Sequence, residues 1–140
     1  MSAARPPGGD RPFAAETPSA SAAGRGPAAA FDLDEALAEL PGDLDMLYEL
    51  AALFLDECPR VLRQTREALD RGDLPAARRG AHTLKSSAGI FAAHDMADAA
   101  YRFERAAADG DAAALPGALA ELEREAVRVT DGLKRLCAGG

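Results

Sequence analysis

The stretch Leu74–Phe91, with the sequence LPAARRGAHTLKSSAGIF, decides how this chain folds. Its apolar residues recur every three or four positions, at Leu74, Ala77, Ala81, Leu84, Ala88 and Phe91. This is the spacing of one face of an α-helix, so we expect a helix from Leu74 to Ile90 or Phe91 that buries the stripe. Many of the stripe residues are alanine, which lets the helix pack closely against its neighbours.

The same spacing continues before and after this stretch, in three further segments. The preceding segment has its apolar positions at Leu47, Leu50, Phe54, Cys58, Val61, Thr65 and Leu69. The next segment, over about residues 95–108, places Met96, Ala100, Phe103 and Ala107 on one face, and the last one repeats the pattern at Leu119, Leu122, Ala126, Val129, Leu133 and Leu136. We expect each segment to be a helix, with a bend at Pro59 because proline removes a backbone hydrogen bond.

The N-terminal part of the chain differs from the rest. Residues 1–30 are rich in Ala, Pro, Gly and Ser, and have too few large apolar groups to offset the entropy of ordering them. We therefore expect a disordered tail over 1–30 and one helical domain over 31–138. That domain should open with a short helix from Asp32 to about Leu40, because Asp32 and Glu35 have the spacing of a capping box.

Glycine and aspartate mark the boundaries between the expected helices. The pairs Gly72-Asp73 and Gly110-Asp111 each join a residue that ends a helix to one that caps the next, and Asp43 can cap the long second helix. No segment alternates apolar and polar residues as a half-buried strand does. The sequence predicts an all-α fold, an antiparallel four-helix bundle with a short additional N-terminal helix.

Charge and composition narrow the classes of function. The 140 residues carry a net charge of −7 and no basic tract, which argues against a nucleic-acid partner. Cys58 and Cys137 lie far apart within apolar helical patterns, so we expect buried free thiols and no metal site. No signal peptide or membrane-spanning run is present in the sequence, and we expect a cytoplasmic protein without a membrane partner.

His82 falls outside the apolar stripe of its helix. A helix turns by about 100° per residue, which places His82 on the exposed side and Lys85 at the border of the stripe. Four further residues share the side of the histidine: Arg78, Arg79, Ser86 and Gly89. The pattern therefore predicts an imidazole in water beside a fixed cation.

Such an imidazole can react with phosphorus. Its usual pKa of roughly 6.5 leaves it largely unprotonated and nucleophilic near neutral pH, so it can form a phosphohistidine. Lys85 could supply charge to the phosphoryl oxygens, while Ser86 and Gly89 leave space for a partner; Ala88, on the stripe, serves close packing. Periodicity alone leaves open that His82 is an ordinary surface residue.

The run His82-Thr83-Leu84-Lys85-Ser86-Ser87-Ala88 closely resembles the His-x-x-Lys-Gly-Ser motif of histidine phosphotransfer (HPt) domains. The resemblance extends over residues 31–136 and includes the opening Phe31-Asp32-Leu33-Asp34-Glu35-Ala36-Leu37, the order of the helices, and Gly89 and Phe91. The chain departs from the family pattern where Ser86 and Ala92 stand in place of frequent glycines.

The resemblance implies a phosphocarrier. His82 would accept a phosphoryl group from the aspartate of a receiver domain and pass it to another receiver, with Lys85 stabilising the charge. The partners would be receiver domains of response regulators or hybrid histidine kinases. The chain has no glycine-rich nucleotide loop, so we expect no ATP site, no enzyme activity of its own and no cofactor. Ser86 would adjust the choice of receiver.

Two other functions are compatible with a helical bundle. A di-iron bundle needs Glu-x-x-His pairs, but the residues three before His82 and His94 are Arg79 and Phe91. A non-catalytic adaptor that docks receivers without phosphotransfer shares the fold and remains an alternative. Arg78 and Arg79 are expected either to steer an acidic receiver or to form an ordinary solvated face. We expect a monomer.

Overall fold

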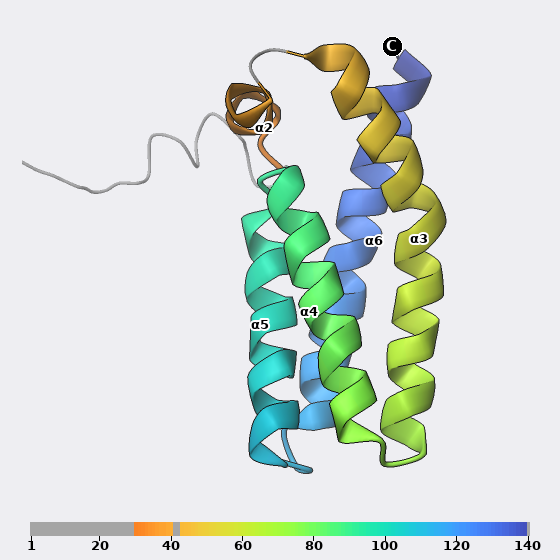
Figure 1. The fold of residues 1–140 in the computed structure, drawn as a ribbon, viewed down its shortest axis with the longest axis vertical. Helices are drawn as coiled ribbons and strands as arrows, with labels where there is room; N and C mark the ends of the chain where they lie inside the picture. Colours follow the sequence, from red (N-terminus) through yellow and green to blue (C-terminus); the bar gives the residue numbers. More distant parts are fainter. Residues whose placement is uncertain (1–29, 41–42, 140) are drawn as a thin grey trace, which may run out of the picture.

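Four long helices run side by side with alternating direction (Figure 1). The computed structural model describes residues 30–40 and 43–139. These contain α2 (Leu33–Glu39), α3 (Leu44–Asp70), α4 (Leu74–Ile90), α5 (His94–Asp109) and α6 (Leu115–Gly139). Within these two ranges there is no strand, and the predicted bundle with a short additional helix is confirmed. The expected tail lies outside the described residues except for Ala30, which is buried against the bundle.

Three of the four aspartates predicted to cap helices do so, whereas Asp111 caps the turn before α6: its side chain accepts a hydrogen bond from the backbone N–H of Ala114 at 3.2 Å, and the helix begins at Leu115. A side-chain oxygen of each capping aspartate accepts a hydrogen bond from the backbone N–H three residues later, at 3.0 Å for Asp32, 2.9 Å for Asp43 and 3.1 Å for Asp73. Gly72 and Gly110 have φ of +77° and +67°, the left-handed conformation that lets the chain leave a helix without steric cost. Local sequence therefore sets where the helices begin and end.

The core follows the predicted stripes, with a few differences. All stripe residues of α4 except the half-buried Leu74 are buried, together with Phe91 just beyond its end. In the other long helices, the positions predicted inward that prove only half-buried are Leu50, Val61, Leu69 and Leu136. Cys58 is 2% exposed, and burial raises the pKa of its thiol to about 11. Cys137 is half-buried, so its expected burial was wrong: it lies in the last turn of α6, where fewer neighbours cover it.

Close packing of α3 against α4 depends on a residue without a side chain. A Cβ atom at Gly80 would overlap the Oγ1 atom of Thr65 on α3. The Thr65 hydroxyl donates a hydrogen bond to the carbonyl of Val61 at 2.8 Å, which satisfies a buried polar group. Gly80 thus lets the two helices approach closely. α3 itself stays helical through Pro59 and changes direction part-way along its length (Figure 1).

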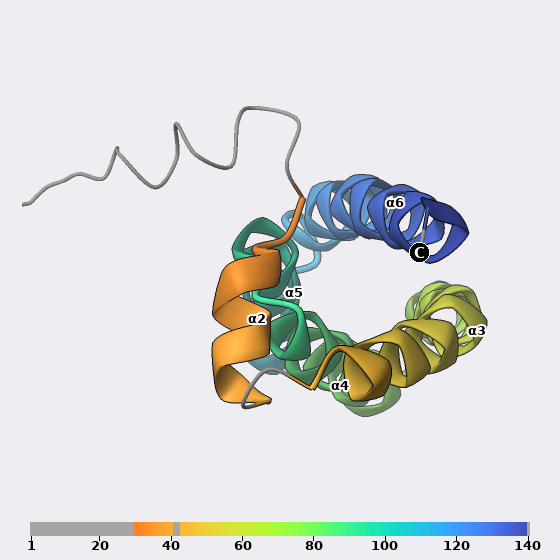
Figure 2. The same cartoon turned by 90° about the horizontal axis from the view of Figure 1, so that it is seen from above.

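The short helix α2 lies across one end of the bundle (Figure 2). The backbone N–H of Asp32 donates to the carbonyl of Phe91 at 3.2 Å, where α4 ends. Glu35 Oε1 lies 2.9 Å from His94 Nε2 at the start of α5. The Phe31 ring lies so close to Gly132 on α6 that a side chain there would meet it. These contacts join α2 and the residues just before it to three of the long helices, and His94 lies at the start of α5.

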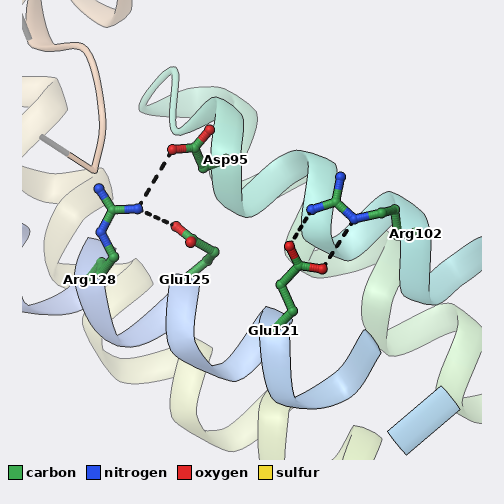
Figure 3. Close-up of polar contacts among 5 residues, drawn as sticks. All are labelled: Asp95, Arg102, Glu121, Glu125 and Arg128. Atoms are coloured by element: carbon green, nitrogen blue, oxygen red, sulfur yellow. Dashed lines mark hydrogen bonds and ion pairs between the residues drawn. The ribbon is translucent and has the colours of Figure 1, made fainter. Parts of the chain in front are cut away.

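Charged pairs fix α5 against α6 (Figure 3). Arg102 donates two hydrogen bonds to the carboxylate of Glu121, the shorter at 2.6 Å. Arg128 on α6 lies 2.7 Å from Glu125 and 3.6 Å from Asp95 on α5. The pairs that join the two helices, Arg102–Glu121 and Arg128–Asp95, are partly exposed, so they contribute more to the register between the helices than to stability. They hold in position the helix that faces His82.

Candidate functional site

The imidazole of His82 lies near the middle of α4, with its side chain 60% exposed. Its Nδ1 atom is 3.1 Å from Oε2 of Glu104 on α5. An ionised carboxylate only accepts hydrogen bonds, so Nδ1 is the donor to Glu104, and in the neutral imidazole Nε2 is then the nitrogen with the free lone pair. The pair with Glu104 therefore orients the ring and selects Nε2 as the nucleophilic atom.

Glu104 joins the histidine to the lysine of the motif. Its side chain is only 15% exposed, and its Oε1 atom lies 2.9 Å from Nζ of Lys85. Burial acts to raise the pKa of Glu104, but the hydrogen bonds and charges of Lys85 and His82 outweigh it and lower the pKa below its ordinary value of 4.5. Glu104 is therefore ionised at neutral pH.

Lys85 is half-buried, as its place at the border of the stripe predicts. Besides Glu104, its Nζ atom lies 5.2 Å from the centre of the Tyr101 ring, a cation–π distance. The ammonium group is thus held by two residues of α5, one turn along α4 from the imidazole. The motif on α4 and the carboxylate on α5 together form a charged triad of His82, Glu104 and Lys85.

Sequence reasoning missed Glu104 and Tyr101. A signal for Glu104 was present: it lies four residues after Ala100 and next to Phe103, at the edge of the buried stripe of α5. A charged group there needs a partner from the facing helix. Which residue faces it depends on the rotation of α4 against α5, and periodicity within one helix does not specify that rotation.

The other predicted residues lie on α4 on either side of His82 along the helix. Arg78 and Arg79 are exposed and line a shallow hollow next to His82, which we call the histidine hollow; Pro75, Thr83 and Glu104 complete it. Ser86 and Gly89 lie further along the exposed side of α4 and do not line this hollow. A Cβ atom at Gly89 would have open space around it, so the surface stays low there.

An apolar groove between α3 and α4 lies on the other flank of the histidine helix. Leu53 and Ile90 at its rim are 56% and 40% exposed, so the groove presents apolar side chains to water. Its floor includes Phe54 and Phe91, whose rings meet edge to face with their centres 5.4 Å apart. This groove, the α3–α4 groove, therefore presents apolar surface beside the helix that carries His82.

Residues 30–40 and 43–139 contain no group of three His, Cys, Asp or Glu side chains that could hold a metal ion. None of the helices described is long and apolar enough to cross a membrane.

Comparisons with known proteins agree with the geometry. Residues 49–138 match the family model of the Hpt domain. The fold is similar to the crystal structure of histidine-containing phosphotransfer protein B (HptB) from Pseudomonas aeruginosa PAO1, with a TM-score of 0.72 and 27% sequence identity over 79% of this chain and 96% of that one. The comparison with curated proteins returns no match. The chain therefore belongs to the Hpt domain family, and its role is that of a phosphocarrier in two-component phosphorelays.

Proposed function

We propose that Nε2 of His82 accepts a phosphoryl group from the aspartate of one receiver domain and passes it to the aspartate of another. The observation that carries this proposal is the exposed imidazole whose Nδ1 atom is hydrogen-bonded to Glu104. This hydrogen bond leaves one ring nitrogen, Nε2, for the reaction, on an imidazole that is exposed to water. The family and the HptB likeness support the class of reaction.

The transfer needs no proton to leave the site. The Nε2 lone pair forms a P–N bond while the P–O bond to the receiver aspartate breaks, and the aspartate leaves as a carboxylate. The ring then carries a positive charge, because Nδ1 keeps its proton. Transfer to the second receiver reverses these bonds. Most of the catalysis in such a step is positioning and charge stabilisation.

Glu104 and Lys85 stabilise different charges. The carboxylate of Glu104 accepts a hydrogen bond from Nδ1–H and stabilises the positive ring of the phosphorylated state. Lys85, one turn from His82, can contact the incoming phosphoryl oxygens once its ammonium group turns from Glu104 towards them. We infer that the ion pair stores Lys85 beside the site until the phosphoryl group arrives.

Four exposed residues are proposed to contact the receiver. Arg78 and Arg79 on the histidine hollow would attract the acidic side of a receiver. Ser86 and Gly89 would keep the surface low enough for the receiver to close over the imidazole. The partners would be receiver domains of response regulators or hybrid histidine kinases, with any magnesium supplied by the receiver. We propose that residues 31–138 form this unit as a monomer in the cytoplasm.

The decisive experiment follows acid-labile phosphate from a phosphorylated receiver to this chain. Wild type should become labelled, and ³¹P NMR should place phosphorus on Nε2. His82→Gln should remain unlabelled, whereas the matched control His94→Gln should behave as wild type, because His94 pairs with Glu35 at the end of the bundle. A receiver that binds wild type without transferring label would favour the adaptor alternative. Label on Nδ1 would contradict the role given to Glu104.

A further inference from the structure

Thr83 borders three hollows on the protein surface, which neither His82 nor Lys85 does. It is exposed on α4 and borders the histidine hollow, the α3–α4 groove and a third hollow that includes Gln64 and Arg79. Among the residues lining these three hollows, Thr83 alone borders all of them. It is also the next residue in the chain after the proposed phosphorylation site.

We propose that Thr83 is a specificity-determining residue of the phosphotransfer surface: its small side chain sets how closely a receiver can approach His82 and which receivers fit. This inference rests on the proposed function. His82 turns towards Glu104 on α5, while Thr83, about 100° further round the helix, turns towards α3. A partner that reaches Nε2 and also contacts the apolar groove must therefore pass over Thr83.

The physical basis is steric. The exposed apolar rim at Leu53 and Ile90 offers a partner contact area, and the arginines of the histidine hollow offer charge. Thr83 separates these two regions, so a long side chain there would fill the space between them. Transfer requires the reacting atoms to be within about 3–3.5 Å, so even a small displacement of the receiver slows it strongly.

Thr83 can be replaced without removing a contact that holds the fold. Among the described residues, none is hydrogen-bonded to its hydroxyl group. Substitutions there therefore test the approach of a partner rather than folding. A small phosphoryl donor, phosphoramidate, can reach Nε2 without docking; its P–N bond breaks as the bond to His82 forms, and ammonia leaves.

The experiment compares Thr83→Ala, Thr83→Val and Thr83→Arg in the full chain, with two different phosphorylated receivers and with phosphoramidate. Val127→Arg is the matched control, because Val127 is 55% exposed on α6, which does not carry the site. We expect Thr83→Arg to slow transfer from receivers by about tenfold or more, equivalent to ~1.4 kcal/mol or more. The ratio of rates for the two receivers should change along the series. Labelling by phosphoramidate should stay within about twofold of wild type.

The outcomes separate this inference from the proposed function. If the ratio of receiver rates is the same in all variants, or if phosphoramidate labelling falls in parallel with receiver transfer, Thr83 does not determine specificity. If wild type takes no label on His82 from either donor, the proposed function itself is wrong. A loss of receiver transfer in Val127→Arg equal to that in Thr83→Arg would also overturn the inference, because it would show a general effect of added charge.

Discussion

Glu104 is the residue on which the chemistry of His82 depends most. Replacing its carboxylate in Glu104→Gln keeps an oxygen that can accept a hydrogen bond from Nδ1–H but removes the charge that stabilises the phosphorylated ring. Hydrogen bonds to charged groups are worth about 1.5–3 kcal/mol, so we expect phosphotransfer to slow by about tenfold or more. Stopped-flow transfer from a phosphorylated receiver measures this, with Glu67→Gln on the exposed side of α3 as control. An unchanged rate would remove Glu104 from the mechanism.

The same residue should give the fold a recognisable pH dependence. Lys85 and His82 lower the pKa of Glu104 in the folded state, so its carboxylate stabilises the fold above the ordinary pKa of 4.5. That contribution is lost as the pH falls through the lowered pKa, because the unfolded chain takes up the proton first. Urea unfolding between pH 7 and pH 3 should therefore show a steeper loss of stability in wild type than in Glu104→Gln. Parallel curves would contradict this assignment.

At the scale of elements, the turn between α4 and α5 contains a strained residue. Ala92 is buried with φ of +53°, the left-handed region, which costs a residue with a side chain about 1–2 kcal/mol more than glycine. Ala92→Gly should therefore raise the free energy of unfolding by about 1 kcal/mol, less the entropy that glycine adds to the unfolded chain. The neighbouring Ala93, with φ of −88°, provides the control, since Ala93→Gly should destabilise. Chemical denaturation measures the free energy of unfolding of the two variants, and a loss of stability in Ala92→Gly equal to that in Ala93→Gly would contradict the prediction.

The contact between α3 and α4 gives a second prediction at this scale. Gly80→Ala would place a Cβ atom against Thr65 Oγ1 and should lower the free energy of unfolding by about 1–3 kcal/mol, the usual effect of overpacking. If the overlap is the cause, adding Thr65→Ala should recover part of the loss. A double-mutant cycle measures that recovery as a coupling energy between the two sites. Strict additivity would show that Gly80 matters for another reason.

At the scale of the whole molecule, the periodicity of the sequence predicted which face of each helix is buried and which is exposed. The stripe from Ala77 to Phe91 is buried and His82 is exposed, because both facts depend only on the helical repeat. The pairing of His82 and Lys85 with Glu104 depends on how α4 and α5 are rotated against each other, which no single segment specifies. Cys137 was misplaced for a related reason, since burial near a helix end depends on how far the neighbouring helices extend.

Electrostatic attraction depends on the charge of the whole molecule, and the contribution of Arg78 and Arg79 to it can be tested. The chain has a net charge of −7, so these two exposed arginines form a local positive region on a negative molecule, next to His82. Electrostatic attraction of that kind mainly speeds association and weakens beyond a Debye length of about 10 Å at 0.1 M salt. Reversing both charges to glutamate should slow transfer by about tenfold at low salt and much less at high salt.

The matched control reverses Arg63 and Arg124, exposed residues of α3 and α6, which changes the net charge by the same amount. Equal effects of the two double variants would show that the net charge matters and that the arginines beside His82 have no special role. If transfer rates of the Arg78 and Arg79 variant match wild type at every salt concentration, the two residues form an ordinary solvated face.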